Sequence, residues 1–343
     1  MQYEVTIGIP IYRAVDYIAK TLESALNQSF ESIEYLVVDD FGEDGSMAIV
    51  EKLQKEHPRG KDIRILYNTQ NKCVVVSRNR ILDEASGRYL YFLDSDDLIE
   101  PETIQLLVNI IREHNADVAY GSMERIDILG GSLVQSFILP NLCFSSKDSL
   151  ALYAFKNHAS FQISVCNCLM DLMFLRRCQL RFIDAVFWED LAFTYEMVTH
   201  VNRAVFISDV TYSYLCRSGS LSHYQDRERL DKNEIQKNIS VMNYLKAKCL
   251  GLKGKDYLPY LCYNLEVNSF YIACYILKHS SRIVPRFKNK EIRMLLSYPL
   301  GGLDIIKFRH RFIFNLFFLF ISKLPTILLV AIVWLFGKIK KAI

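Results

Sequence analysis

The feature that most constrains the fold is a regular alternation over the first 120 residues between short apolar runs and helical patterns. Apolar residues recur at helical spacing over 16–27, 46–53, 74–85 and 101–114, which predicts four helices. Ser46 is a suitable N-cap for the second helix, and Pro101 suits the first turn of the fourth. Continuous apolar runs predict buried strands at 5–9, 34–38, 63–67, 89–93 and 118–120. This alternation predicts an α/β domain with a mostly parallel sheet and helices on both faces.

Carboxylates follow two of the predicted strands. Asp39 and Asp40 come directly after the second strand, and Asp94-Ser95-Asp96-Asp97 follows the fourth. In open parallel sheets, ligands bind beyond the carboxyl ends of the strands. We therefore expect segments 10–13, 39–46 and 94–97 to be neighbours in space and to carry the chemistry.

The strongest chemical signal is the group of three carboxylates at Asp94, Asp96 and Asp97. Such a group is costly unless a cation or hydrogen-bond donors compensate its charge. Mn²⁺ and Mg²⁺ bind one or two carboxylates together with substrate phosphates. The alternative, a solvated acidic turn before the next helix, accounts for one carboxylate but not for three.

The pair of carboxylates at Asp39 and Asp40 is suited to binding a nucleoside. Asp39 or Asp40 could accept a hydrogen bond from a uracil N–H or a ribose hydroxyl, and Tyr12 offers a flat ring on which a base can stack. Taken singly, each is equally well explained as a turn or surface residue. Their expected convergence at one sheet edge favours the binding role.

Five stretches, in this order, resemble one known family. They are IPIYRAVDYIAKTLESALNQSF (9–30), YLVVDDFGEDGS (35–46), VSRNRILDEASGRYLYFLDSDD (76–97), WED (188–190) and RSGSLS (217–222). The chain resembles the inverting glycosyltransferase family two, of the type that builds bacterial surface polysaccharides, whose catalytic domain has the GT-A fold. The chain departs from the family at Arg13, where Asn is frequent, and at Phe41-Gly42, where Gly-Ser is frequent.

The resemblance implies a site for a nucleotide-sugar donor. Tyr12 and Asp40 would hold the base with Asp39 nearby, and Arg78 would lie against the donor. Asp96 and Asp97 would bind Mn²⁺ or Mg²⁺, although the two overlapping DxD registers do not say which aspartate binds directly. The donor-binding residues expected in full are Pro10, Tyr12, Arg13, Asp39, Asp40, Arg78, Asp94, Ser95, Asp96 and Arg217.

On the acceptor side, the resemblance implies that Asp190 is the general base, with Glu189 and Trp188 contacting the acceptor. Inversion by one displacement needs a carboxylate opposite the leaving diphosphate, and a separate segment can supply it. Without the resemblance, two acids at a helix N-terminus would explain the same residues. The 217–223 loop would close over the diphosphate, with Arg217 as the main contact and His223 as a weaker one.

Composition excludes several other classes. The net charge of +3 is too small for a broad basic field, so we expect no nucleic acid partner. Nine scattered cysteines without a CxxC pair are interpreted as free thiols of a reducing compartment. Nothing at the N-terminus resembles a signal peptide. No phosphate-loop, dinucleotide-binding or HExxH motif suggests a different chemistry.

Three parts of the chain are expected: a GT-A catalytic domain at 1–225 (donor half 1–121, acceptor half 122–225), a helical subdomain at 226–304, and membrane-associating helices at 305–343. In the last part, two apolar runs of 11 residues, 312–322 and 326–336, have basic flanks. Each is shorter than the roughly 20 residues that span a bilayer. Two interfacial helices on anionic headgroups are favoured over a kinked span, a buried hairpin or a homo-oligomer contact.

The sequence thus predicts a metal-dependent glycosyltransferase, of the hexosyltransferase type, on the cytoplasmic face of the inner membrane. It would move a sugar, expected from a UDP-sugar, to a hydroxyl of a growing, lipid-linked surface glycan. The alternative is a non-catalytic sugar-nucleotide-binding subunit of a membrane glycan-assembly complex. The sequence does not identify the sugar, the acceptor or the linkage position.

Overall fold

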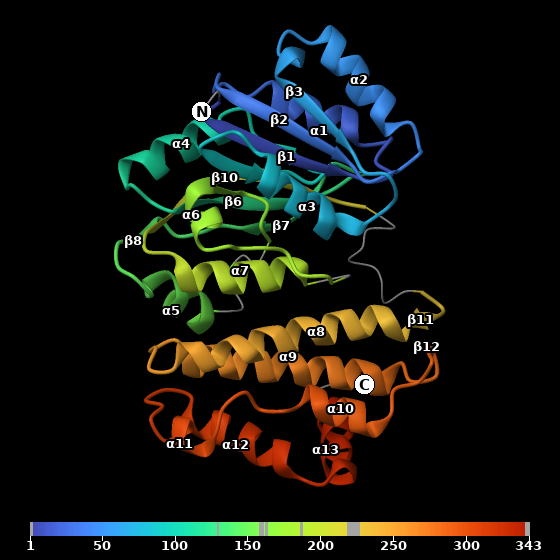
Figure 1. Cartoon of the computed structure of the whole chain (residues 1–343), viewed down its shortest axis with the longest axis vertical. Coiled ribbons are helices and arrows are strands. Elements are labelled where there is room, and N and C mark those ends of the chain that lie inside the picture. Colours follow the sequence, from blue (N-terminus) through green and yellow to red (C-terminus); the bar gives the residue numbers. More distant parts are fainter. Residues whose placement is uncertain are drawn as a thin grey trace. The chain divides into compact units, whose positions relative to one another are not determined.

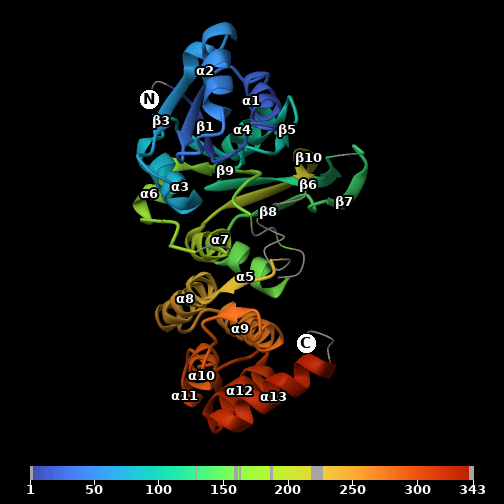
Figure 2. The same ribbon diagram turned by 90° about the vertical axis from the view of Figure 1, so that its right-hand side faces the viewer.

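In the computed structural model, the predicted alternation of strands and helices forms a mixed sheet, and further helices follow it in the chain (Figure 1). The structure describes residues 3–128, 130–157, 161, 164–185, 188–217 and 227–339. Within these residues the sheet has ten strands in the order β3-β2-β1-β4-β9-β6-β10-β5, with β7 added beside β6 and β8 beside β10. Helices lie on both sides of this sheet (Figure 2).

The strands of the sheet, with the short pair β11–β12 outside it, have the following bounds: β1 Val5–Ile11, β2 Ile33–Asp39, β3 Ile63–Tyr67, β4 Tyr89–Phe92, β5 Leu98–Ile99, β6 Val118–Asp127, β7 Leu133–Phe137, β8 Leu142–Phe144, β9 Cys168–Asp171, β10 Ala204–Cys216, β11 Leu230–Asp231 and β12 Ile283–Val284. β1 pairs in parallel with β2 and β4, β2 with β3, and β6 with β10. β9 runs antiparallel between β4 and β6. The α/β class with a mostly parallel sheet is therefore confirmed.

The α-helices have the following bounds: α1 Ile18–Leu26, α2 Ser46–Glu56, α3 Cys73–Glu84, α4 Thr103–Glu113, α5 Ser149–Lys156, α6 Leu172–Arg177, α7 Glu189–His200, α8 Lys232–Lys248, α9 Leu258–Lys278, α10 Asn289–Leu295, α11 Gly302–Ile305, α12 Phe312–Lys323 and α13 Thr326–Ile339. Helix α3 packs on β1 and β2, and α4 packs on β6, β9 and β10. The approach of α3 is close: a Cβ at Gly8 of β1 would lie 2.4 Å from Ile81 Cγ2. A glycine in β1 is therefore what allows this contact.

Two helix starts differ from the prediction. The N-cap of α2 is Gly45, not Ser46, with φ of 90°, a conformation that glycine adopts without strain. The Ser46 hydroxyl instead donates to Asp44 Oδ1 at 2.6 Å. Pro101 precedes α4 rather than opening it, because Glu102 is the N-cap.

The chain divides into two units. The first comprises Met1–Leu150, Gln162–Phe182 and Glu196–Ser220, and it holds the ten-stranded sheet. The second comprises Ala151–Phe161, Ile183–Tyr195 and Leu221–Ile343.

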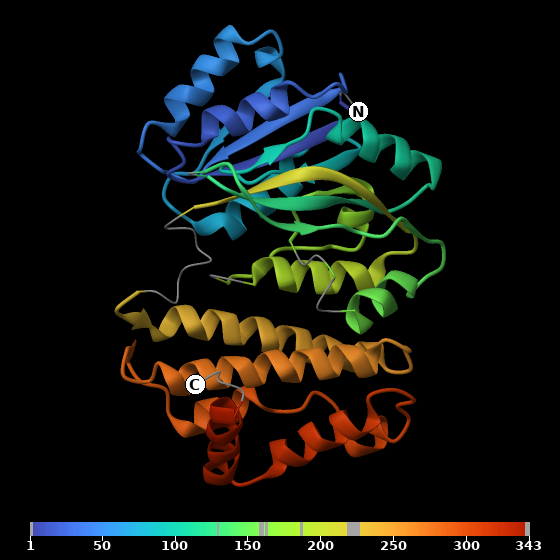
Figure 3. The same ribbon diagram turned by 180° about the vertical axis from the view of Figure 1, so that it is seen from behind.

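In the second unit α8 and α9 lie side by side (Figure 3). A buried ion pair joins them, with Lys246 Nζ at 2.8 Å from Glu266 Oε1. Lys246 also donates to the carbonyl of Leu295, the last residue of α10, and to that of Ser297, so one ammonium group connects three helices.

The two apolar runs near the C-terminus form helices α12 and α13, and both pack against α9. Ile321, Leu329 and Val333 are buried there, so these helices contribute to the interior of the second unit. No helix among the described residues is both long enough and apolar enough to cross a bilayer.

Candidate active site

The three loops expected to meet at the carboxyl edge of the sheet do so. The Asp40 N–H donates to the Ile11 carbonyl at 2.8 Å, and the Leu93 N–H donates to the Gly8 carbonyl at 3.1 Å. The Ala14 N–H donates to Ser46 Oγ at 3.0 Å, which joins the loops after β1 and β2. These hydrogen bonds confirm that the segments following β1, β2 and β4 are neighbours.

Asp94 is paired with Arg78 of α3. The Arg78 Nη2 lies 2.9 Å from Asp94 Oδ1, and the arginine side chain is only 4% exposed against 33% for the aspartate. The guanidinium also lies 5.5 Å from the centroid of the Phe182 ring. Arg78 is thus a buried counter-charge that positions Asp94, whose carboxylate extends toward solvent.

Asp96 is paired with Arg217, the residue that follows β10. Both Nε and Nη2 of Arg217 lie 2.7 Å from Asp96 Oδ2. The Tyr17 ring supports this guanidinium, with its centroid 4.8 Å away. Burial and the neighbouring Asp94 charge raise the pKa of Asp96, while Arg217 opposes this rise.

Asp97 has a different environment from the other two aspartates. It is 2% exposed, and its oxygens accept hydrogen bonds from the Tyr212 hydroxyl at 2.7 Å and the Leu215 N–H at 2.8 Å. Burial first, and then the charges of Asp94 and Asp96, raise its pKa well above the ordinary value of 3.8. Asp97 therefore fastens the Asp94–Asp97 loop to β10.

The donor set fits a hard divalent cation held jointly with a diphosphate. Asp94 and Asp96 each give one oxygen to an arginine and are only partly buried, and Mg²⁺ or Mn²⁺ needs only one or two carboxylates when phosphates complete the shell. No group of three or more His, Cys, Asp or Glu side chains forms a ready-made cage in the part of the chain that the structure describes. Both oxygens of Asp97 already accept hydrogen bonds. Of the two predicted metal ligands, Asp96 is therefore favoured over Asp97 for direct contact with the ion.

Asp39 and Asp40 face different surroundings. Asp40 is 2% exposed, and its Oδ1 accepts from Asn68 Nδ2 at 2.8 Å and from the Lys72 N–H at 3.0 Å. Asp39 instead lines a cavity of about 300 Å³, whose wall includes Phe41 and Tyr67. Burial raises the pKa of Asp39, and the Gly42 and Phe41 N–H groups partly offset the rise. Of the two, Asp39 is the one placed to meet a ligand.

The remaining predicted donor residues lie along the same edge. Tyr12 is 43% exposed beyond the end of β1, and the Arg13 guanidinium lies 5.3 Å from its ring centroid. Pro10 is buried within β1, opposite Val38 of β2. The Ser95 carbonyl accepts from Thr21 Oγ1 at 3.1 Å, which ties the aspartate loop to α1.

The predicted acceptor residues stand at the beginning of α7. Glu189 and Asp190 occupy its first turn, and Trp188 precedes it with φ of 69°. All three are half-buried, and they belong to the second unit. Their predicted roles stay predictions. Of the predicted diphosphate loop 217–223, residues 218–223 with His223 lie outside the described residues.

Sequence reasoning missed three tyrosines that complete the site: Tyr17 beneath Arg217, Tyr67 in the cavity wall, and Tyr212 on Asp97. Tyr67 could have been found, because it ends a predicted parallel strand, where ligands bind. Tyr212 could not, since its partner lies 115 residues away.

The fold and this cluster of carboxylates define a GT-A-type sugar-nucleotide domain. The profile of Glycosyl transferase family 2 matches residues 6–170, and this part of the chain belongs to that family. It is 30% identical over 230 residues to glycosyltransferase GlyA of Streptococcus pneumoniae, a match covering 64% of this chain but only 31% of GlyA. It is 25% identical over 248 residues to an Escherichia coli protein, UDP-Glc:alpha-D-GlcNAc-diphosphoundecaprenol beta-1,3-glucosyltransferase WfaP, covering 72% of this chain and 90% of WfaP.

A solved structure has the same fold. Residues 1–349 of Staphylococcus aureus TarS, in complex with UDP-GlcNAc, superpose with a TM-score of 0.62 at 19% identity, covering 94% of this chain and 89% of TarS 1–349. The chain therefore has the GT-A fold, as its sequence predicted. The profile match and the curated relatives make it a glycosyltransferase.

Proposed function

We propose that this enzyme transfers a hexose, with inversion, from a UDP-sugar to a hydroxyl group of a lipid-linked precursor of a bacterial surface glycan. One observation carries the proposal: the Asp94 and Asp96 carboxylates are framed by Arg78 and Arg217 at a sheet edge that also presents Asp39 beside a cavity. The two arginines can bind phosphate oxygens of a diphosphate, and the two carboxylates can bind a divalent cation that bridges to it. The Asp39 cavity suits the nucleoside.

Asp96, with Asp94, would hold the Mn²⁺ or Mg²⁺ ion. When bound, such an ion stabilises the charge that develops on the departing diphosphate. Arg217 would exchange part of its contact with Asp96 for a phosphate oxygen, since guanidinium binds both groups in the same planar geometry. Asp97 would keep the loop in place through Tyr212.

Asp190 is proposed to accept the proton of the acceptor hydroxyl, with Glu189 and Trp188 orienting the acceptor. A general base of this kind contributes about 10²–10⁴ to the rate. Support comes from the sequence pattern and from the position of both acids in the first turn of α7.

The relatives support the donor and acceptor classes. TarS has been solved with UDP-GlcNAc, and the name of WfaP specifies a UDP-sugar, a diphosphoundecaprenol-linked acceptor and a β-linkage. A lipid-linked acceptor is consistent with our proposal that the enzyme works peripherally at the cytoplasmic face of the inner membrane, through α12 and α13. A non-catalytic binding subunit is not favoured, because it would need no acceptor-side carboxylate.

The test is nucleotide release from a panel of sugar nucleotides, with and without Mn²⁺ or Mg²⁺. We expect slow release from one UDP-sugar without acceptor, faster release with a lipid diphosphate-linked acceptor, and none in chelator. Binding of a sugar nucleotide without any turnover, in the presence of metal and acceptor, would instead support the binding-subunit alternative.

A further inference from the structure

Helix α12 buries a polar side chain and exposes most of its large apolar ones. Asn315 is fully buried, and its side chain is satisfied on every side: it donates to the Pro259 and Arg311 carbonyls and accepts from the Tyr298 hydroxyl at 2.7 Å. Six large apolar side chains of the same helix are exposed instead. Those at least 38% exposed are Phe312, Ile313, Phe314, Leu316, Phe317 and Phe320. A helix built this way has an outer face suited to an apolar medium.

Neighbouring helices extend this face. Leu303 and Ile306, at α11, are 81% and 70% exposed. On α13, Trp334 is 51% exposed with Lys338 Nζ 5.5 Å from its ring centroid, the pairing of tryptophan and lysine found at membrane–water boundaries. We call the exposed side chains of α11, α12 and α13 the apolar face.

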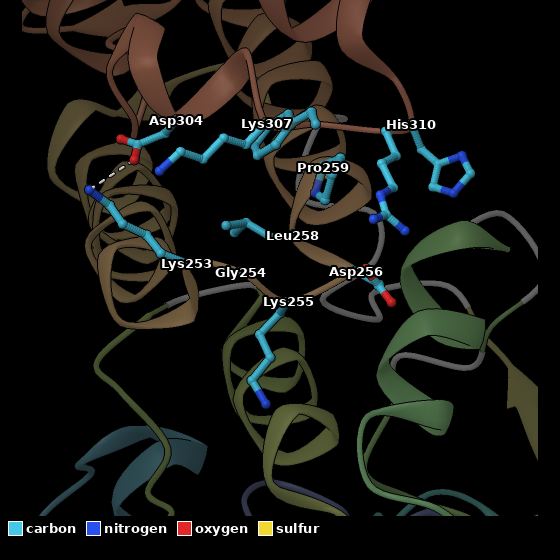
Figure 4. A pocket seen from close by; sticks show the side chains of 11 residues that line it. Lys253, Gly254, Lys255, Asp256, Leu258, Pro259, Asp304, Lys307 and His310 are labelled. Carbon is cyan, nitrogen blue, oxygen red and sulfur yellow. Dashed lines mark ion pairs between the residues drawn. The ribbon is translucent and has the colours of Figure 1, made fainter.

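A basic pocket opens where the chain enters α12. Its volume is about 520 Å³, and its wall carries four lysine or arginine side chains against two aspartates: Lys253, Lys255, Lys307 and Arg309, Asp256 and Asp304. Figure 4 shows Lys253 and Lys307 both directed toward Asp304, and Lys255 extending away from them. The Lys253 Nζ lies 3.1 Å from Asp304 Oδ1, so this lysine is already paired.

Of the three other basic side chains, Lys307 and Arg309 are the recognition elements. Lys307 and Arg309 are exposed at the rim, and His310 beside them is stacked on Tyr260 of α9 at 5.6 Å between ring centroids. The residues that follow, Arg311 and Phe312, lead directly into the apolar face, and Leu258 and Pro259 give the pocket an apolar wall. An anionic group in the pocket would therefore have its hydrocarbon part next to α12.

We propose that this pocket and the apolar face together bind one membrane lipid with a phosphate-containing headgroup, the phosphate on Lys307 and Arg309 and the hydrocarbon chain along α12. This inference rests on the membrane attachment in the proposed function, not on the transfer chemistry. A second copy of the chain is a poorer occupant, because a symmetric contact on this face would bring two positively charged pockets together. The lipid supplies both the negative charge and the apolar surface.

The test is flotation of the full-length protein with phosphatidylcholine vesicles, with and without a minor fraction of phosphatidylglycerol. Replacing Lys307 and Arg309 together by Ala should lower the partition coefficient onto anionic vesicles by roughly tenfold or more, since each basic residue near a surface contributes about fivefold. Binding to neutral vesicles should change little. Ile313→Ser with Phe317→Ser should reduce binding to both kinds of vesicle.

The matched control is Arg286→Ala with Lys290→Ala, which removes the same charges from exposed positions of the same unit outside the pocket. This control should change anionic binding by less than about twofold, because screened charges act only within about 10 Å. Equal losses in both double variants, no loss in either, or a wild-type protein that ignores vesicles would each overturn the proposal. Unchanged melting temperatures confirm that the variants fold.

Inorganic diphosphate separates a lipid headgroup from a soluble anion. At matched ionic strength it should release the wild-type protein from anionic vesicles more than sodium chloride does, and it should not do so for the Lys307/Arg309 variant. Tight binding of diphosphate alone, measured by calorimetry and lost in the Lys307/Arg309 variant, would assign the pocket to a soluble anion and overturn the lipid assignment. Donor hydrolysis is measured on the same samples, so a failure of the proposed transfer function is seen separately.

Discussion

The Arg217 guanidinium meets the Asp96 carboxylate with two nitrogen atoms, each 2.7 Å from the same Oδ2 oxygen. Arg217 stands at the end of β10 and Asp96 after β4, so the pair closes the site across strands far apart in sequence.

Removal of Arg217 should move the acid limb of the pH profile. Arg217 opposes the rise in the pKa of Asp96, so Arg217→Met should raise this pKa further. If Asp96 must be ionised for activity, the Arg217→Met variant should lose activity on acidification at a higher pH than the wild type does. The measurement is kcat/KM against pH, with Arg217→Lys as the charge-retaining control. An acid limb at the same pH in Arg217→Met would show that Asp96 does not govern it.

Substitution of Asp96 should remove metal-supported turnover. We expect Asp96→Asn to lower kcat by more than about a hundredfold, because the proposed cation loses a ligand and the diphosphate loses its compensation. Chelation should abolish wild-type activity, and added Mn²⁺ should restore it. Asp209→Asn, at an exposed position on β10, is the control. Full wild-type turnover in chelator would contradict metal dependence.

Asp97→Asn should change how stability depends on pH. The folded protein raises the pKa of Asp97 above 3.8, so the folded state holds this proton more tightly than the unfolded chain. Ionisation of Asp97 therefore lowers the free energy of unfolding as the pH rises from about 4 toward the folded-state pKa. Asn stays neutral, so the Tm of the variant should rise relative to wild type over this range.

A weakened hydrogen bond to Tyr212 or to the Leu215 N–H would cost about 1 kcal/mol at every pH, so the slope of the Tm difference is the informative quantity. Parallel Tm curves for the two proteins would mean that Asp97 has no raised pKa. Turnover should fall in the same variant, since the loop is less firmly held.

Asp39→Asn should weaken UDP binding by about 10–100-fold, the usual range when a hydrogen bond to a charged group is lost. Tyr67→Ala should weaken it as well, because the cavity loses its aromatic wall. Tyr67→Phe keeps the ring and serves as the matched control. Calorimetric titration with UDP gives all three values. Unchanged affinity in Asp39→Asn would move the nucleoside away from this cavity.

Asp190→Asn should lose about 10²–10⁴ in kcat while the affinity for the donor stays the same. The product of the wild-type enzyme should have the anomeric configuration opposite to that of the donor, as NMR coupling constants would show. A product with retained configuration excludes a single displacement. Loss of donor binding in the variant would place Asp190 on the donor side.

Sequence periodicity was sufficient for the parallel half of the sheet, because β1, β2 and β4 are buried strands rich in apolar residues, and helices follow β1, β2 and β3 in the chain. It was insufficient for β7, whose residues are all exposed, and for β9, which inserts between β4 and β6. Strand order depends on long-range pairing, which a local pattern does not encode.

The candidate site was predictable in composition but not in roles. DSDD identified three carboxylates, yet only the folded chain separates Asp97, held by Tyr212, from Asp94 and Asp96, which face arginines. The same holds for Asp39 and Asp40, adjacent in sequence but different in exposure.

Burial of Asn315 also has a consequence for biogenesis. Only one rotation of α12 about its own axis satisfies the side-chain amide, so the helix cannot rotate to bury its exposed side chains, such as Phe317 and Phe320, without losing these hydrogen bonds. A newly synthesised chain thus has no form with the same hydrogen bonds in which the exposed side chains of α12 are covered. If α12 binds lipid as proposed, we expect the chain to depend on prompt delivery to a membrane, or on a chaperone that covers α12 until then.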